Sequence, residues 1–174
     1  AAVVSHAHCP VVVVRGDNPV TEDTKYGPVV VGVDGSGVSQ KAIEYAFAEA
    51  SARECELIAV HTWMDMQIQA SLAGLSAAQQ QWKIVEEEQN MLLGHRLAGY
   101  AERYPDVQVT RVVTRDRPVR ALVDAAKGAQ LLVVGSHGRG GFKGMLLGST
   151  SRALLQSAPC PMMVVRPDSD AKAH

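Results

Sequence analysis

The sequence predicts an α/β domain built on an open, five-stranded parallel sheet with helices on both faces. Short, uninterrupted apolar runs such as LLVV at 131–134 are typical of strands that are buried on both faces. Between residues 29 and 166 such runs alternate with helical patterns, in the order β-α-β-α-β-α-β-α-β. This alternation favours parallel strands joined by right-handed crossovers. The 174 residues are enough for one such domain with its own core.

Each element follows from a local pattern, in chain order. The predicted strands span 29–37 (ending in a turn), 56–63, 107–116, 130–134 and 162–166. The predicted helices span 39–53, 76–103 and 118–127, and a last one runs to about Ser157. Apolar residues share one face of the first helix, Pro105 ends the second, and Pro118 and Gly128 bracket the third.

Composition and charge exclude several classes of partner. The formal net charge is -1, so no bulk attraction to nucleic acid or to anionic lipid is expected. Aromatic residues make up 5% of the chain, too few for a base-stacking surface. The three cysteines have neither CxxC nor zinc-ligand spacing, and no apolar run is long enough to cross a membrane. We therefore expect a cytoplasmic protein that binds neither nucleic acid nor membrane.

Residues 1–15 resemble residues 152–166 after a shift of 151 positions. Seven of the fifteen positions are identical, among them a Cys-Pro pair and a terminal Val-Val-Arg in each segment. Two short apolar strands can resemble each other by chance, but Cys-Pro and Arg at fixed spacing argue against that. The chain is therefore expected to be the C-terminal part of a tandem protein. Its expected parts are the last helix and strand of an upstream copy (1–16), a linker (17–28), the complete domain (29–167) and a polar tail (168–174).

The glycine-rich stretch GSHGRGGFKGMLLGST, which begins at Gly135, says most about function. It follows a buried strand and precedes a helical pattern that offers Ser149 and Thr150 as capping residues. Backbone N–H groups at a helix start are unpaired, and the helix dipole favours negative charge there. Gly135 lets the chain turn off the strand, while Gly138 and Gly148 remove side chains that would keep a phosphate from the backbone. The stretch is therefore a candidate anion site, with hydroxyl donors on Ser149 and Thr150.

The spacing of this stretch differs from two common phosphate loops. The chain has no Gly-Lys-Ser/Thr, hence no P-loop, and Lys143 stands where the dinucleotide fingerprint needs its third glycine. The observed pattern, G-x2-G-x9-G-[ST], resembles the nucleotide-binding signature of the universal stress protein family. VGVDGS and VHTW, at the ends of the first two predicted strands, also occur in the family's order. A plain turn between a strand and a helix is the alternative.

The resemblance implies a Rossmann-like fold of the adenine nucleotide alpha hydrolase-like type, with sheet order 3-2-1-4-5. It also implies that ATP lies across the carboxyl ends of the strands. Its phosphates would be held by Gly135, Gly138, Gly148, Ser149 and Thr150. Tandem-domain proteins of actinobacteria are similar, and last strands in the family often pair across a two-fold interface. We therefore expect a homodimer, or a pseudo-dimer with the upstream domain, in which 11–15 docks on the edge strand 162–166 of this chain or of a partner.

Asp34 lies at the carboxyl end of the first strand, the edge at which open α/β sheets bind ligands. A carboxylate there can bind a ribose hydroxyl or a magnesium ion. An Asx turn or helix cap with Gly35 and Ser36 explains this residue equally well. The resemblance favours the ligand role, because the family carries an aspartate after its first strand, at the nucleotide site.

Further residues complete the candidate site. Thr62 follows His61 at the end of the second strand, where the family contacts adenine through the backbone. Val113 lies near the carboxyl end of the third strand, where the family often contacts the base or ribose. Arg139 can neutralise phosphate charge, and His137, inside the motif, is expected to brace the loop rather than act as an acid or base. His61 is interpreted as a structural histidine, because no Ser, Cys or Asp partner can be placed beside it.

Three classes of function stay open from the sequence. The leading hypothesis is an ATP-binding regulatory domain, with or without magnesium, whose output is an ATP-dependent change in dimer or partner contacts. A slow ATPase, or a nucleotidyl transferase, is the second. No positioned base or second carboxylate can be named for it, so efficient hydrolysis is not expected. A nucleotide-free interaction module is the third, and the intact glycine signature argues against it. A role in stress or dormancy is implied only by the resemblance.

Overall fold

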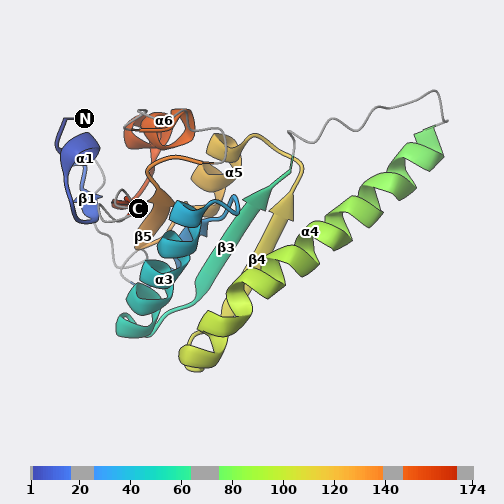
Figure 1. Ribbon diagram of the computed structural model, residues 1–174, viewed down its shortest axis with the longest axis horizontal. Helices are drawn as coiled ribbons and strands as arrows, with labels where there is room; N and C mark the ends of the chain where they lie inside the picture. The colour runs from blue at the N-terminus through green and yellow to red at the C-terminus, as the bar shows by residue number, and fades with distance from the viewer. Residues whose placement is uncertain (1, 17–25, 64–74, 139–146, 168–174) are drawn as a thin grey trace, which may run out of the picture.

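The computed structural model describes residues 2–16, 26–63, 75–138 and 147–167 (Figure 1). The helices of this described part are α1 (Ala2–His6), α3 (Gly37–Ala52), α4 (Leu75–Arg103), α5 (Pro118–Ala125) and α6 (Ser149–Ser157). The strands are β1 (Val11–Val13), β2 (Val29–Gly32), β3 (Leu57–Thr62), β4 (Val109–Thr114), β5 (Leu131–Gly135) and β6 (Met162–Val165). From β2 to β6 strands and helices alternate, as the sequence predicts.

The strands of the described part form one sheet in the order β1-β6-β5-β2-β3-β4. Strands β2 to β6 are parallel and follow the predicted order, third-second-first-fourth-fifth. The prediction of a five-stranded, all-parallel sheet is nevertheless wrong, because β1 adds a sixth strand that runs antiparallel to β6. An apolar strand edge carries unpaired N–H and C=O groups, and β1 pairs with those of β6. The expected docking of 11–15 on the last strand is thus confirmed within this chain, over Val11–Val13.

Helices cover both faces of the sheet, each over its own apolar core (Figure 1). On one face α3 and α4 contribute Phe47 and Leu93, which are fully buried. On the other face α5 and α6 contribute Leu122 and Leu154, and α1 adds Val4. Successive strand residues point alternately into the two cores, which explains why the central strands read as uninterrupted apolar runs.

The turn after β2 is set by local hydrogen bonds. The Ser36 hydroxyl accepts a hydrogen bond from the N–H of Ser39 (3.2 Å) and caps α3, which therefore begins at Gly37, earlier than predicted. β2 ends at Gly32, and the chain reverses at Gly35, whose φ of 81° suits a residue without a side chain. This tight turn fixes Asp34 at the carboxyl edge of the sheet.

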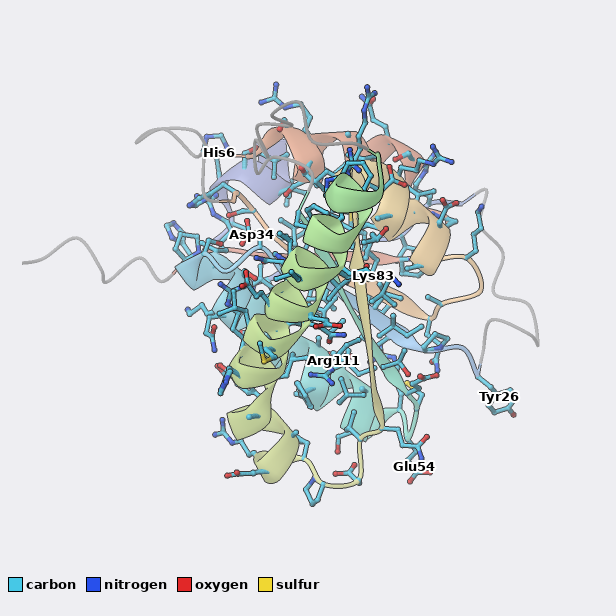
Figure 2. All side chains as sticks on the ribbon, turned by 90° about the vertical axis from the view of Figure 1, so that its right-hand side faces the viewer. His6, Tyr26, Asp34, Glu54, Lys83 and Arg111 are labelled. Atoms are coloured by element: carbon cyan, nitrogen blue, oxygen red, sulfur yellow. The ribbon has the colours of Figure 1, made fainter. Side chains whose placement is uncertain are left out.

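Helix α4 is the longest element, with 29 residues, and its N-terminal end extends away from the sheet (Figure 1). Arg111 of β4 lies beneath it (Figure 2) and donates to the carbonyl oxygen of Asn90 (3.3 Å). Near the start of the helix, the Arg115 guanidinium lies 4.1 Å from the centre of the Trp82 ring, a cation–π contact. None of the helices in the described part is both long enough and apolar enough to cross a membrane.

Candidate functional site

A cavity of about 550 Å³ opens at the carboxyl ends of β2, β3 and β5. β2 and β5 are neighbours in the sheet, but the helix after β2 packs on one face and the helix after β5 on the other. Open α/β sheets form their binding crevice at such a topological switch point. The cavity is lined by residues 32–34, 60–63, 134–135, 137–138 and 148–151, together with Ser39, Gln89, Pro118 and Leu122.

Most of the predicted site residues meet in this cavity. Those that line it are Asp34, Thr62, Gly135, His137, Gly138, Gly148, Ser149 and Thr150. Val113 is not brought to the lining found among the described residues. It lies on β4 opposite His61 and packs against the core beneath α3 and α4. Arg139 lies outside the described residues.

The N-terminus of α6 forms one end of the cavity. Gly148 is its N-cap, with φ -68° and ψ 162°, and no side chain caps the first turn. The expectation that Ser149 and Thr150 are capping residues is wrong, because both already lie within the helix. The nearby Ser151 hydroxyl donates instead to the carbonyl oxygen of Gly135 (2.7 Å). The first amides of α6 therefore meet the cavity uncapped, with the positive end of the helix dipole behind them.

The three motif glycines let two loops and a helix start pack closely. A Cβ atom at Gly138 would lie 2.3 Å from Oδ2 of Asp34, and one at Gly148 would lie 3.1 Å from Cα of His137. A Cβ atom at Gly135 would lie 3.0 Å from Val38. These directions point at protein atoms, so the idea that Gly138 and Gly148 keep space for a phosphate needs correction. Their first role is to allow the loop after β5 to touch the end of β2 and the start of α6.

Asp34 has one carboxylate oxygen held by the protein and the other directed at the glycine-rich loop. Its Oδ1 accepts a hydrogen bond from the N–H of Ser36 (2.9 Å), and its own N–H donates to the Ser39 hydroxyl (3.1 Å). The Asx turn that the sequence allowed is therefore present, and it coexists with a place in the cavity lining. Figure 2 shows Asp34 toward the end of the molecule where α4 begins, opposite Glu54. The turn fixes the carboxylate beside Gly138.

Thr62 ends β3 beyond the last paired residue of its neighbour β2. The N–H of Trp63 donates to Thr114 on the β4 side (3.3 Å), so the backbone groups of Thr62 point to the β2 side. There the last bond runs from the N–H of Val33 to the carbonyl oxygen of Val60 (2.9 Å). Among the described residues, no backbone group pairs with Thr62 on that side. An N–H and a C=O thus lie next to each other at the other end of the cavity.

His61 braces the same end of the cavity. It is buried, its Nδ1 donates to the carbonyl oxygen of Val33 (2.7 Å), and its Nε2 lies 2.9 Å from the side-chain oxygen of Gln89. A carbonyl oxygen only accepts, which places a proton on Nδ1. These two contacts support the structural interpretation of this histidine. Buried Trp63 lines the cavity beside it.

Sequence reasoning missed several lining residues that lie far from the motifs. Gln89 reaches the cavity from α4, and Pro118 and Leu122 reach it from α5. Gln89 had a signal, because a glutamine on the buried face of a helix pattern needs polar partners. Pro118 was recognised only as the start of a helix. That this helix starts at the binding edge follows from the parallel order of the strands.

The cavity offers one carboxylate for a cation. Among the described residues, no three His, Cys, Asp or Glu side chains are grouped as a metal site. Asp34 is the carboxylate in the lining. Magnesium is commonly held by one or two carboxylates together with the phosphates of a substrate. The residues present thus fit a magnesium ion that arrives with a phosphate chain.

Known proteins place this geometry in a family. The sequence model of the "Universal stress protein family" matches residues 25–166. Universal stress protein Rv2005c of Mycobacterium tuberculosis is 51% identical over 166 residues, which cover 95% of this chain and 54% of that protein. The chain thus spans about half the length of the curated relatives it matches.

Solved structures share the fold. UspA from Lactobacillus plantarum has a TM-score of 0.68 at 21% identity, covering 81% of this chain and 98% of that one. A universal stress protein in complex with cAMP has a TM-score of 0.57 at 26% identity, covering 83% of this chain and 99% of that one. The extent of the sequence match, together with the strand order and the glycine spacing at the cavity, leads to one conclusion: the chain belongs to the universal stress protein family.

Proposed function

We propose that this chain is an ATP-binding domain with a regulatory role in stress response. One observation carries the proposal. The uncapped N-terminus of α6 and the unpaired backbone of Thr62 face the same cavity at the switch point of the sheet. A helix N-terminus is suited to phosphate, and an adjacent N–H and C=O are suited to the edge of a base. The related protein solved with cAMP supports an adenine nucleotide as the ligand class.

The phosphates are proposed to lie at the α6 end. The first amides of α6 and the hydroxyls of Ser149 and Thr150 would donate to phosphate oxygens. Arg139, next in sequence to Gly138, would add positive charge. Asp34 would accept a hydrogen bond from the ribose or hold magnesium against the phosphates. Its position beside Gly138, close to the phosphate end, makes both roles possible without a rearrangement of the turn.

The base is proposed to lie at the Thr62 end. Adenine presents a ring nitrogen acceptor beside its amino group, and these match the N–H and C=O of one residue. Guanine presents the opposite pair, a ring N–H beside a carbonyl oxygen, so ATP should bind more tightly than GTP. Pro118 and Leu122 provide apolar surface for the ring. Val113 is left out of this arrangement because its side chain packs into the core.

Regulation is proposed to act through ATP-dependent contacts with partners in the cytoplasm. Binding is the proposed activity, and a single carboxylate without a positioned base gives no basis for efficient hydrolysis. Timed measurement of ADP from purified protein with ATP separates binding from a slow ATPase. Nucleotide released when the purified protein is heated separates both from a nucleotide-free module.

Isothermal titration with ATP, with and without magnesium, tests the site. Gly138→Val would displace Asp34 and crowd the loop, and we expect ATP affinity to fall at least 30-fold, which corresponds to about 2 kcal/mol. Gly99→Val is the matched control, because a Cβ at Gly99 on α4 meets no atom within 4 Å. Unchanged affinity in Gly138→Val, or no binding by the original chain at millimolar ATP, would overturn the proposal.

A further inference from the structure

The N-terminal segment 2–16 is a structural copy of residues 153–167. α1 ends at His6 and α6 ends at Ser157, and these positions differ by the same 151 residues as the sequence similarity. Each helix closes with the same backbone bond. The N–H of Ala7 donates to Val3 (2.9 Å), and the N–H of Ala158 donates to Leu154 (2.8 Å). The similarity in sequence thus extends to the backbone.

The two copies meet in a reciprocal contact. In the β1–β6 pair, Val12 lies opposite Met163, which is its own equivalent. Side-chain contacts repeat in both directions: Arg15 donates to the carbonyl oxygen of Gln156, and Arg166 donates to that of Ser5. Contacts in which i meets j and j meets i are the property of a two-fold interface. A local two-fold axis therefore passes between Val12 and Met163.

Equivalent side chains in the two copies differ sharply in exposure. Leu154, Met163 and Val165 are buried in the domain, with exposed fractions of 0%, 6% and 1%. Their equivalents in the N-terminal segment have exposed fractions of 72% (Val3), 46% (Val12) and 68% (Val14). The first set is covered by the rest of its own domain. The second set forms an apolar surface, the outer N-terminal surface, on an edge strand.

We propose that the outer N-terminal surface docks a second domain of this same fold, to which residues 2–16 supply the last helix and strand. A strand of that domain would lie beside β1 as β5 lies beside β6, and would bury Val12 and Val14. The curated relatives are long enough for this, because the chain covers only 54% of the relative described above. The apolar side chains of the surface suit the core of a domain better than solvent.

The symmetry fixes how the two domains would be arranged. Since β1 runs antiparallel to β6, the strands of the second domain would end at the opposite edge of one continuous sheet. A crevice at their carboxyl ends would face away from the cavity described here. Coupling between the two sites would then pass through the β1–β6 seam and its paired arginine contacts. This inference does not depend on the proposed ATP binding.

Two equivalent cysteines report on the inference. Burial raises the pKa of the Cys160 thiol to about 11, which keeps it protonated and unreactive. Its equivalent Cys9 is exposed. In the 174-residue chain we expect iodoacetamide to modify Cys9 and spare Cys160. In the same chain extended at its N-terminus by its natural preceding sequence, modification of Cys9 should slow at least tenfold, about 1.4 kcal/mol of protection.

A pair of substitutions tests the surface itself. Val14→Asp should lower the melting temperature of the extended polypeptide and leave that of the 174-residue chain unchanged. Ile84→Asp, at an equally apolar position on α4 that is 57% exposed, should change neither. Equal reactivity of Cys9 in both chains would overturn the proposal. Protection of Cys9 that grows with the concentration of the 174-residue chain would also overturn it, because a second copy would then occupy the surface.

Discussion

Replacing Gly138 by alanine tests the contact that joins the glycine-rich loop to the end of β2. The new Cβ atom would lie 2.3 Å from Oδ2 of Asp34, well inside the 3.0 Å that Cβ atoms keep from other atoms. The carboxylate would have to turn away. It would then lose the hydrogen bond that its Oδ1 accepts from the N–H of Ser36 (2.9 Å).

The size of the effect follows from that bond. Hydrogen bonds to charged groups contribute about 1.5–3 kcal/mol, and the lower part of this range suits a carboxylate that is partly open to water. Alanine also restricts the unfolded chain, which offsets about 0.4–1 kcal/mol of the loss. We therefore expect Gly138→Ala to lower the free energy of unfolding by about 1 kcal/mol.

A double-mutant cycle isolates the contact. In an Asp34→Ala background no carboxylate opposes the new Cβ atom, so Gly138→Ala should be neutral or slightly stabilising. The coupling free energy between the two positions, measured by urea unfolding of the four proteins, should be about 1–2 kcal/mol. A coupling below about 0.3 kcal/mol would refute the reasoning, because the two residues would then behave as independent sites.

Two further predictions concern the backbone. Thr62→Val keeps the backbone N–H and C=O of β3, so ATP affinity measured by calorimetry should stay within about threefold, and a larger loss would assign the contact to the hydroxyl. Glu54 is exposed and has a φ of 52°, a left-handed conformation that favours glycine. Glu54→Gly should therefore raise the free energy of unfolding by about 0.5–1 kcal/mol in a thermal melt, and a lower stability would contradict the strain argument.

The alternation of strands and helices could be predicted because the central strands are buried on both faces. Runs such as Val29–Gly32 have no polar face, and this pattern distinguishes a parallel sheet with two helical layers from other folds. The sixth strand could not be assigned to one sheet from the sequence. The repeat indicated that 11–15 pairs with the last strand, but the same pairing could have formed between two chains. The turn at residues 10–16 and the room beside β6 decide this in three dimensions.

The cavity was located by the glycine spacing, but the contacts that fill it were not. Gly138 and Asp34 are 104 positions apart in sequence, so their approach depends on the neighbouring positions of β2 and β5. Val113 was misplaced relative to the cavity by one residue of strand alternation, since Val112 points to the opposite core. Strand ends can be predicted from a sequence, whereas the face that each terminal side chain takes depends on register.

The two tryptophans of the chain are placed so that one can serve as an optical probe. Trp63 is buried in the wall of the cavity, whereas Trp82 lies against a guanidinium outside the lining. In a Trp82→Phe chain the remaining indole emission would come from the cavity alone. Occupancy of the crevice could then be followed by fluorescence in unlabelled protein.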